Sequence, residues 1–251
     1  MNIQANCVIL AAGEGKRMQS NIPKVMSLVY GKPMLYHVIK ACYASGIENI
    51  CVVTGFKHEV VDNYLKEEFP SVKTALQKKR LGTAHAVICA KDFLKNSNCD
   101  TTFVLNGDAP FIDANTLQNA CRLHKINKNS ATVISSKINN PDGYGRIVRD
   151  KLNNEMKYIV EQKDANEEEL KINEVNSGAY AFNTCELLNS IDKIRNDNAQ
   201  GEFYLTDIIS LFKRLGKNVD AVISSNPYTV MGANNLEQLE ILNNIAKEIF
   251  K

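Results

Sequence analysis

The sequence predicts an α/β protein with a mostly parallel sheet flanked by helices and a small β-rich insertion in its second half. Up to residue 137, short β-rich runs alternate with amphipathic helical patterns, which is typical of right-handed β-α-β units on a parallel sheet. From Pro141 onward, two strand-like runs joined by a polar turn replace this alternation and indicate a hairpin. At 251 residues the chain is long enough to bury the core that such a fold needs.

Each element of the first half has its own signal. After Pro33, apolar residues recur at i, i+3, i+4 and i+7 from Leu35 to Cys42, and Gly46 stands where a left-handed residue would end that helix. Asp113 is a candidate N-cap of a later helix. The strands expected here are Cys7–Leu10, Ile50–Val53, Val72–Gln77, Thr101–Leu105 and Ala131–Lys137. The helices expected are one from Pro33 to Gly46, then His58–Phe69, Thr83–Leu94 and Asn115–Ile126. The result is a Rossmann-like sheet, in which ligands bind at the carboxyl ends of the strands.

The second half is expected to begin with a hairpin of Gly145–Arg149 and Met156–Val160. The charged stretch Lys163–Lys171 is most simply an exposed helix start or a loop. The remaining strands expected are Glu174–Phe182 and Val219–Ser224, and the remaining helices are Cys185–Ile194, Thr206–Leu215 and an amphipathic helix from Leu236 to Ile249.

The composition excludes several classes of protein. A net charge of +2 gives no general attraction to nucleic acid or membranes. The short basic run Lys78-Lys79-Arg80 is most simply a solvated loop, and the alternative is a nucleic-acid patch. No apolar run approaches the ~20 residues that span a bilayer, and the N-terminus lacks the pattern of a signal peptide. We therefore expect a cytoplasmic protein whose seven cysteines are reduced and hold no structural metal.

The loop after the first strand is the strongest functional signal. Gly13 and Gly15 let the backbone come close to a ligand, so that amide N–H groups can face phosphate oxygens, and Lys16, Arg17 and Lys24 can neutralise their charge. Two other phosphate motifs do not fit: Met18 stands where the dinucleotide fingerprint has its third glycine, and Leu10 where the Walker loop has its first. The loop therefore predicts a polyphosphate site, and the alternative is a plain turn.

Asp108 is the candidate metal ligand. It follows the buried strand that ends at Leu105 and should lie on the same edge of the sheet as the glycine loop. Magnesium prefers oxygen ligands and takes one or two carboxylates together with substrate phosphates. The alternative is that Gly107-Asp108 only forms a turn. We find no Ser-His-Asp or Cys-His spacing that indicates a nucleophile, and His85 is not expected to be catalytic.

Several segments of the sequence resemble motifs of the sugar-1-phosphate nucleotidylyltransferase family. The most similar members are its N-acetylglucosamine-1-phosphate uridylyltransferase domains of the GlmU type. The resemblance begins with Leu-Ala-Ala-Gly-x-Gly-x-Arg-Met and Pro-Lys-Val, and it covers Cys7 to about Asn235 in order. Further similar segments are Gln77 with Leu81–Ala86, Asn106–Pro110, Gly143–Ile147, Glu161–Ala165, Asn176–Gly178, Gly201–Asp207 and Gly232–Asn235. The departures are Lys16 for threonine, Asn106 for tyrosine, Ser177 for threonine, and a longer hairpin turn.

This resemblance implies the nucleotide-diphospho-sugar transferase fold, with a nucleotide half at residues 1–137, a sugar-binding half at 138–234, and a C-terminal helix at 235–251. It implies a Mg²⁺ cofactor on Asp108 and Asn234, although Asn234 alone would be interpreted as a helix N-cap. Arg17 and Lys24 take the catalytic role. The implied substrate contacts are Leu10, Ala11, Ala12, Gly13, Gly15, Lys24, Gln77, Gly82, Thr83, Asn106, Gly107, Gly145, Glu161, Asn176 and Asn234.

The activity implied is synthesis of UDP-N-acetylglucosamine and pyrophosphate from UTP and N-acetylglucosamine-1-phosphate, for peptidoglycan and lipopolysaccharide. The sugar phosphate is already an anion, so its attack on the α-phosphate needs positioning and charge neutralisation rather than a base. The alternatives are another sugar or alcohol phosphate, CTP as the nucleotide, or a non-catalytic sugar-nucleotide binder. The acetylating β-helix domain of the family has no counterpart in the sequence, so that activity is not expected; a homo-oligomer stays open.

Overall fold

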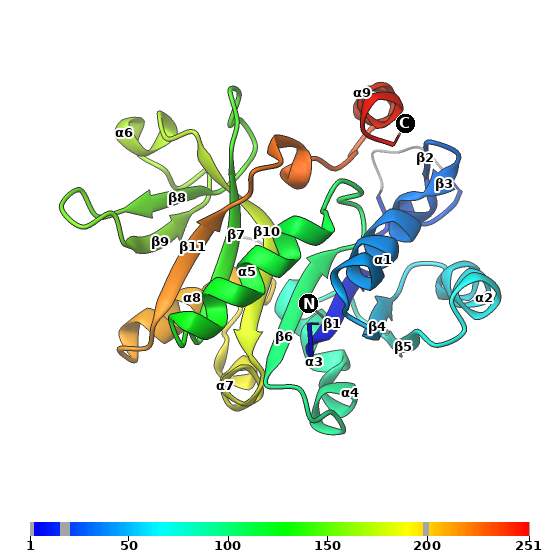
Figure 1. The fold of residues 1–251 in the computed structure, drawn as a ribbon, viewed down its shortest axis with the longest axis horizontal. Helices are drawn as coiled ribbons and strands as arrows, with labels where there is room; N and C mark the ends of the chain where they lie inside the picture. The colour runs from blue at the N-terminus through cyan, green and yellow to red at the C-terminus, as the bar shows by residue number, and fades with distance from the viewer. Residues whose placement is uncertain (1–2, 16–20, 198–200, 251) are drawn as a thin grey trace.

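The computed structural model describes residues 3–15, 21–197 and 201–250, and its centre is a nine-stranded sheet with helices on both faces (Figure 1). The strands are β1 (Asn6–Ala11), β2 (Leu28–Val29), β3 (Lys32–Pro33), β4 (Asn49–Thr54), β5 (Lys73–Leu76), β6 (Thr101–Asn106), β7 (Ala131–Lys137), β8 (Arg146–Arg149), β9 (Met156–Val160), β10 (Glu174–Asn183) and β11 (Val219–Ile223). The helices are α1 (Met34–Ser45), α2 (His58–Glu68), α3 (Thr83–Cys89), α4 (Lys91–Lys95), α5 (Ala114–Ile126), α6 (Glu167–Leu170), α7 (Thr184–Ser190), α8 (Thr206–Arg214) and α9 (Leu236–Ile249). Short 3-10 turns occupy Lys24–Met26, Ile191–Lys193 and Pro227–Val230.

The main path of the sheet has the order β11-β7-β10-β6-β1-β4-β5. Strand β1 is parallel to both of its neighbours, β4 and β6, and β4 is parallel to β5. Strand β10 is antiparallel to β6 and to β7, whereas β7 and β11 are parallel. All strands of this path except β10 therefore run in one direction, which confirms the prediction of a mostly parallel sheet.

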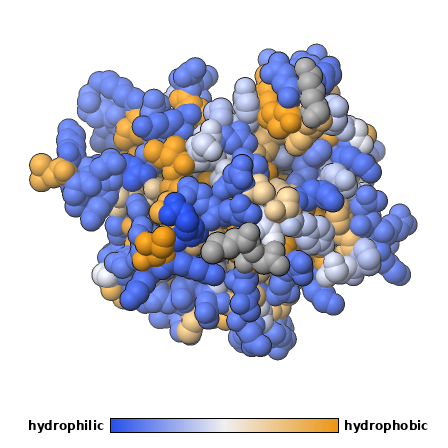
Figure 2. All heavy atoms as spheres, in the orientation of Figure 1, coloured by the Kyte–Doolittle hydropathy of each residue, from blue (hydrophilic) through white to orange (hydrophobic). Residues whose placement is uncertain are grey.

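Two hydrophobic clusters cover the two faces of the sheet, and a third supports the C-terminal helix. The first joins one face to α1, α2 and α5, and the second joins the other face to α3, α4, α7 and α8. Near-continuous apolar runs such as β1 suit strands that are covered on both sides. The third cluster packs α9 against β2, the start of α1 and Phe111. Figure 2 shows hydrophobic residues gathered over α9, on a face that is otherwise mostly hydrophilic.

Local stop and start signals were predicted correctly, and one helix was not. Gly46 ends α1 in the left-handed conformation, with φ 93°, and Asp113 caps α5 by accepting from Thr116 N–H at 2.8 Å. The predicted helix Thr83–Leu94 is divided at Ala90, whose φ of −92° and ψ of 7° leave the helical region. Its N–H reaches Val87 O at 3.0 Å, a three-residue step that closes α3 and turns the chain into α4. Among the described helices, none is long and apolar enough to cross a bilayer.

The β-rich insertion forms as expected. Strands β8 and β9 make an antiparallel hairpin that joins the sheet through β10, where Arg146 pairs with Val175. The charged stretch after the hairpin is the start of the short helix α6, whose Asn166 and Glu169 form a capping box. The structure adds the small β2–β3 hairpin and the 3-10 turns, which carry no periodicity by which they could be predicted.

Candidate active site at the carboxyl edge of the sheet

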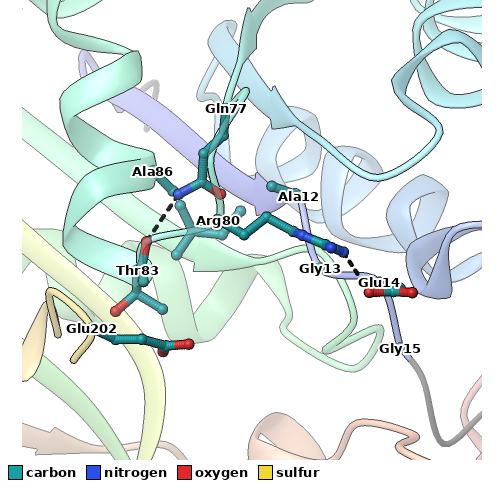
Figure 3. Close-up of a pocket in the computed structure, with 11 residues that line it drawn as sticks. Ala12, Gly13, Glu14, Gly15, Gln77, Arg80, Thr83, Ala86 and Glu202 are labelled. Atoms are coloured by element: carbon teal, nitrogen blue, oxygen red, sulfur yellow. Dashed lines mark hydrogen bonds and ion pairs between the residues drawn. The ribbon is translucent and has the colours of Figure 1, made fainter. Parts of the chain in front are cut away.

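A cavity of about 520 Å³ opens where β1 and β5 end (Figure 3). It lies between the glycine loop that follows β1 and the segment that joins β5 to α3. The lining residues are Leu10, Ala12, Gly13, Glu14, Gly15, Gln77, Arg80, Gly82, Thr83, Ala86 and Glu202. The carboxyl edge of the sheet is where open α/β folds bind their ligands, so the cavity is in the expected place.

The glycine loop is shaped by two close approaches. Gly15 has φ +64°, and a Cβ built there would lie 2.7 Å from Lys24 Cβ, so the stem of Lys24 lies directly against the loop. On the other side, Ala12 O accepts from Phe56 N–H at 3.2 Å. A Cβ at Gly13, in contrast, would have no atom within 4 Å. The backbone at Gly13 is therefore open to a ligand, whereas Gly15 is needed for packing.

The opposite wall is a rigid network around Gln77. The amide nitrogen of this buried side chain donates to Gly82 O at 3.0 Å, and it lies 3.0 Å from Nδ1 of His85. Gly82 has φ +108°, and a Cβ there would lie 2.5 Å from Phe203 O. Thr83 Oγ1 accepts from Leu205 N–H at 2.9 Å. The segment around Phe203 therefore packs against this wall at Gly82 and Thr83. Gly82 in turn holds the Gln77 side chain, and His85 lies beside that side chain as a further support.

Lys24, Asp108 and Asn234 meet at the end of the glycine loop. The ammonium of Lys24 forms an ion pair with Oδ2 of Asp108 and donates to Oδ1 of Asn234 at 2.7 Å. The side chains of Lys24 and Asp108 are 13% and 28% exposed. A Cβ at Gly232 would lie 2.8 Å from Asp108 O, so this glycine lets the segment before α9 approach β6. Residues 210 positions apart thus converge on one point.

The N-cap alternative for Asn234 is wrong. The cap of α9 is Asn235, whose side chain accepts from Gln238 N–H at 2.8 Å. The side chain of Asn234 instead bonds to Lys24, and its backbone N–H donates to Gln238 Oε1 at 2.7 Å. Its amide oxygen therefore contacts the ammonium that also pairs with Asp108, and does not cap the helix.

This donor set fits a hard divalent cation. A carboxylate oxygen and an amide oxygen both contact one positive charge, the ammonium of Lys24, and oxygen ligands of this kind suit Mg²⁺. Within the described residues, no three His, Cys, Asp or Glu side chains cluster as metal ligands. The protein would thus supply two ligands, and substrate phosphates and water the others.

A second group of predicted residues lies along β8, β9 and β10. Gly145 O accepts from Asn176 N–H at 2.8 Å, and a Cβ at Gly145 would lie 3.2 Å from Oε1 of Glu161. The side chain of Asn106 lies against Gly178, whose φ of +73° and missing Cβ leave room for it. Gly145, Glu161, Asn176 and Asn106 therefore form one continuous surface.

The surface formed by Gly145, Glu161, Asn176 and Asn106 connects to the cavity and the Lys24 cluster at two points. Gly107 N–H donates to Leu10 O at 2.9 Å, which joins the end of β6 to a residue that lines the cavity. Tyr144, next to Gly145, lies close enough to Asp108 that burial and the negative charge of that carboxylate raise the pKa of its phenol. The surface and the cavity thus belong to one edge of the sheet.

The charge at Glu161 is disfavoured. Burial, followed by the negative charges of Asp164 and Asp207, raises the pKa of its carboxyl above the ordinary value. Burial also raises the pKa of Asp207. Glu161 stays exposed to solvent, so a ligand can reach this partly desolvated carboxylate and stabilise its charge by donating hydrogen bonds, as sugar hydroxyls do.

The predicted residues fall into three groups. Leu10, Ala12, Gly13, Gly15, Gln77, Gly82 and Thr83 line the cavity; Lys24, Asn106, Gly107, Asp108, Gly145, Glu161, Asn176 and Asn234 adjoin it by the contacts above; Ala11 is buried beneath the loop. Arg17 and Lys16 lie outside the described residues. Their roles stay predictions, but the edge of the sheet brings the described members of the set together.

Sequence reasoning missed Glu14, Arg80, Ala86 and Glu202, which also line the cavity. Arg80 was assigned to a solvated basic run, and its guanidinium is in fact paired with Glu14 across the cavity (Figure 3). Glu202 belongs to a segment that the family resemblance covers, but charge and spacing alone do not indicate that it faces a ligand.

Comparison with known proteins identifies relatives of this chain. The profile of the nucleotidyl transferase family, described as "Nucleotidyl transferase", matches residues 6–227. The bifunctional protein GlmU of Clostridium botulinum (strain 657 / Type Ba4) is 46% identical over 236 residues, which are 93% of this chain and 50% of that protein. The bifunctional protein GlmU of Clostridium tetani (strain Massachusetts / E88) is also 46% identical, over 235 residues with the same coverage. The chain spans about half the length of these relatives.

Solved structures agree in fold. A Bacillus anthracis protein provisionally assigned as a glucose-1-phosphate thymidylyltransferase, solved with sucrose, has a TM-score of 0.81 and 24% identity, covering 97% of this chain and 96% of that one. A UDP-glucose pyrophosphorylase complexed with UDP-glucose has a TM-score of 0.78 and 19% identity, covering 98% and 100%. At these identities the likeness concerns the fold alone.

Proposed function

The chain belongs to the nucleotidyl transferase family, and from that premise we propose that it makes UDP-N-acetylglucosamine and pyrophosphate from UTP and N-acetylglucosamine-1-phosphate. The observation that carries the proposal is the meeting of Lys24, Asp108 and Asn234 beside the glycine-lined cavity. A phosphoryl or nucleotidyl transfer site needs positive charge, a metal-ligand pair and close backbone approach at one point. Lys24 supplies the charge, Asp108 and Asn234 the ligand pair, and the open backbone at Gly13 the close approach. The printed names of the GlmU relatives support the choice of substrates.

The reaction depends on positioning and charge neutralisation. The sugar phosphate is an anion and attacks the α-phosphorus of UTP, so the oxygen–phosphorus bond to pyrophosphate breaks as the new one forms. Open backbone amides at Gly13, together with Lys24 and Arg17, would bind the phosphate oxygens and stabilise the leaving pyrophosphate. Mg²⁺ held by Asp108 and Asn234 would act as a Lewis acid on these phosphates. No side chain is needed to remove a proton from the nucleophile.

The two surfaces of the site would divide the substrates. Gln77, Gly82 and Thr83 are proposed to read the uracil ring, because a fixed amide and backbone groups can match its alternating donors and acceptors. Gly145, Glu161 and Asn176, with Asn106 beside them, are proposed to bind the amino sugar. This corresponds to a nucleotide half at residues 1–137 and a sugar-binding half at 138–234, in a protein that works in the cytoplasm.

The test is release of pyrophosphate by the purified chain with UTP, N-acetylglucosamine-1-phosphate and Mg²⁺. Replacing UTP by CTP, and the acetylated sugar phosphate by glucosamine-1-phosphate, separates the proposal from related transfers. We expect UTP and the acetylated sugar to be preferred and a chelator to stop the reaction. Preference for another pair would overturn the substrate assignment, and binding without any pyrophosphate release would indicate a non-catalytic sugar-nucleotide binder.

A further inference from the structure

An ion pair spans the mouth of the cavity. NH1 of Arg80 lies 2.7 Å from Oε2 of Glu14, and the two side chains are 46% and 29% exposed. Glu14 belongs to the glycine loop, and Arg80 belongs to the segment that carries Gln77 and Gly82 on the opposite wall. Figure 3 shows the side chain of Arg80 extended across the cavity toward this carboxylate.

The charges of the lining make Arg80 unusual. Among the lining residues that the structure describes, Arg80 is the single cation, and the other charged groups are the carboxylates of Glu14 and Glu202. Like charges repel at short range, so neither carboxylate can itself bind a phosphate. Arg80 is thus the one charged group of this described lining that can attract a phosphate.

The pair with Glu14 is weak enough to exchange. Ion pairs as exposed as this one contribute little to stability, because water and salt screen the two charges. A terminal phosphate offers several charged oxygens, and a guanidinium can bind two of them at once. The guanidinium carbon also lies 5.8 Å from the ring centre of Phe56, so the charged group has a second contact that does not involve Glu14.

We propose that Arg80 binds the β- and γ-phosphates of the incoming nucleotide, and that it reaches them by exchanging its partner Glu14 for phosphate oxygens. The inference rests on the proposed function, because it names the group at this site that recognises a triphosphate as opposed to a monophosphate. Gln77, Gly82 and Thr83 line the same cavity and are left to contact the nucleoside.

The experiment is calorimetric titration of UTP and of UMP into the wild-type chain and into the Arg80→Gln variant. Loss of one charge-assisted contact at an exposed site should weaken UTP binding about five- to tenfold and leave UMP binding within about twofold. Lys79→Gln is the matched control, because Lys79 is an exposed cation next in sequence that does not line the cavity. That variant should bind both nucleotides as the wild type does.

Other results would overturn the inference. Equal weakening of UTP and UMP would mean that Arg80 acts on the nucleoside or on the fold, and unchanged UTP binding would mean that it contacts no phosphate. The same loss in Lys79→Gln would reduce the effect to general electrostatics. Glu14→Gln should bind UTP more tightly, because the competing partner is gone; weaker binding would refute the exchange. If wild-type protein failed to bind UTP, the proposed function would fall with the inference, whereas failure of the variants alone leaves it standing.

Discussion

Gly13→Ala should separate ligand binding from folding. A Cβ at this position would have no protein atom within 4 Å, and Gly13 is not among the glycines with positive φ. The fold should therefore accept alanine, and reduced freedom of the unfolded chain should leave the free energy of unfolding unchanged or raise it by up to about 1 kcal/mol. The new methyl group would instead point into the space where a phosphate must approach the backbone.

The expected loss of binding follows from that geometry. If the methyl group prevents one backbone amide from reaching a phosphate oxygen, about 1.5–3 kcal/mol is lost, and this corresponds to about 10- to 150-fold weaker binding of UTP. Urea unfolding measures the stability, and calorimetric titration with UTP measures the binding.

Gly31→Ala is the matched control. Gly31 also has open space around it but has φ +74°, so alanine there should cost about 1–2 kcal/mol of stability through backbone strain and leave UTP binding unchanged. If Gly13→Ala bound UTP within twofold of the wild type while remaining folded, close approach of phosphate to this loop would be refuted.

Three further predictions concern the metal pair, the insertion and the core. Asp108→Asn should lower turnover at least about 100-fold and raise the Mg²⁺ concentration needed, as pyrophosphate release will show. Arg149→Ala should lower the free energy of unfolding by about 3–5 kcal/mol, because Glu174, whose side chain is 7% exposed, loses its two 2.8 Å bonds to the guanidinium. The control is Lys157→Ala, which breaks an exposed ion pair in the same hairpin and should cost less than about 1 kcal/mol when both variants are unfolded in urea. Burial lowers the pKa of His124 to about 4, so on acidification the unfolded chain binds the proton first. The free energy of unfolding should therefore fall by about 3 kcal/mol from pH 6.5 to pH 4. His124→Gln should remove this dependence of stability on pH, and an unchanged dependence would contradict the assignment.

Much of the fold was predictable because its signals are local. Gly46 ends α1 and Asp113 begins α5 through contacts within a few residues, and such contacts follow from residue type. The order of the strands was not predictable. The apolar pattern of the sequence indicates that β10 is a strand, but it does not indicate that β10 lies between β6 and β7. The break between α3 and α4 at Ala90 was not predictable either, because no glycine or proline marks it in the sequence.

The same division applies to the site. Gly13, Gln77 and Asp108 stand in short motifs whose chemistry can be stated from sequence, and the structure brings these segments to one edge. The pair of Arg80 with Glu14 joins residues 66 positions apart, and no local pattern encodes it. Charge runs are usually solvated faces, so the functional interpretation of such a run needs the fold first.

Insertion of β10 is what makes one site from two halves of the chain. Its pairing with β7 shifts register between Asn176 and Ala179, and Ser177 Oγ holds the bulge by donating to Ile134 O at 2.6 Å. Gly178, at φ +73°, then lets the bulge lie against the Asn106 side chain at the end of β6. Because β6 also lies beside β1, a single strand end connects the surface proposed to bind the sugar with the glycine loop. The amide of Asn106 therefore lies at the junction between the β10 bulge and the end of β6 that adjoins the glycine loop.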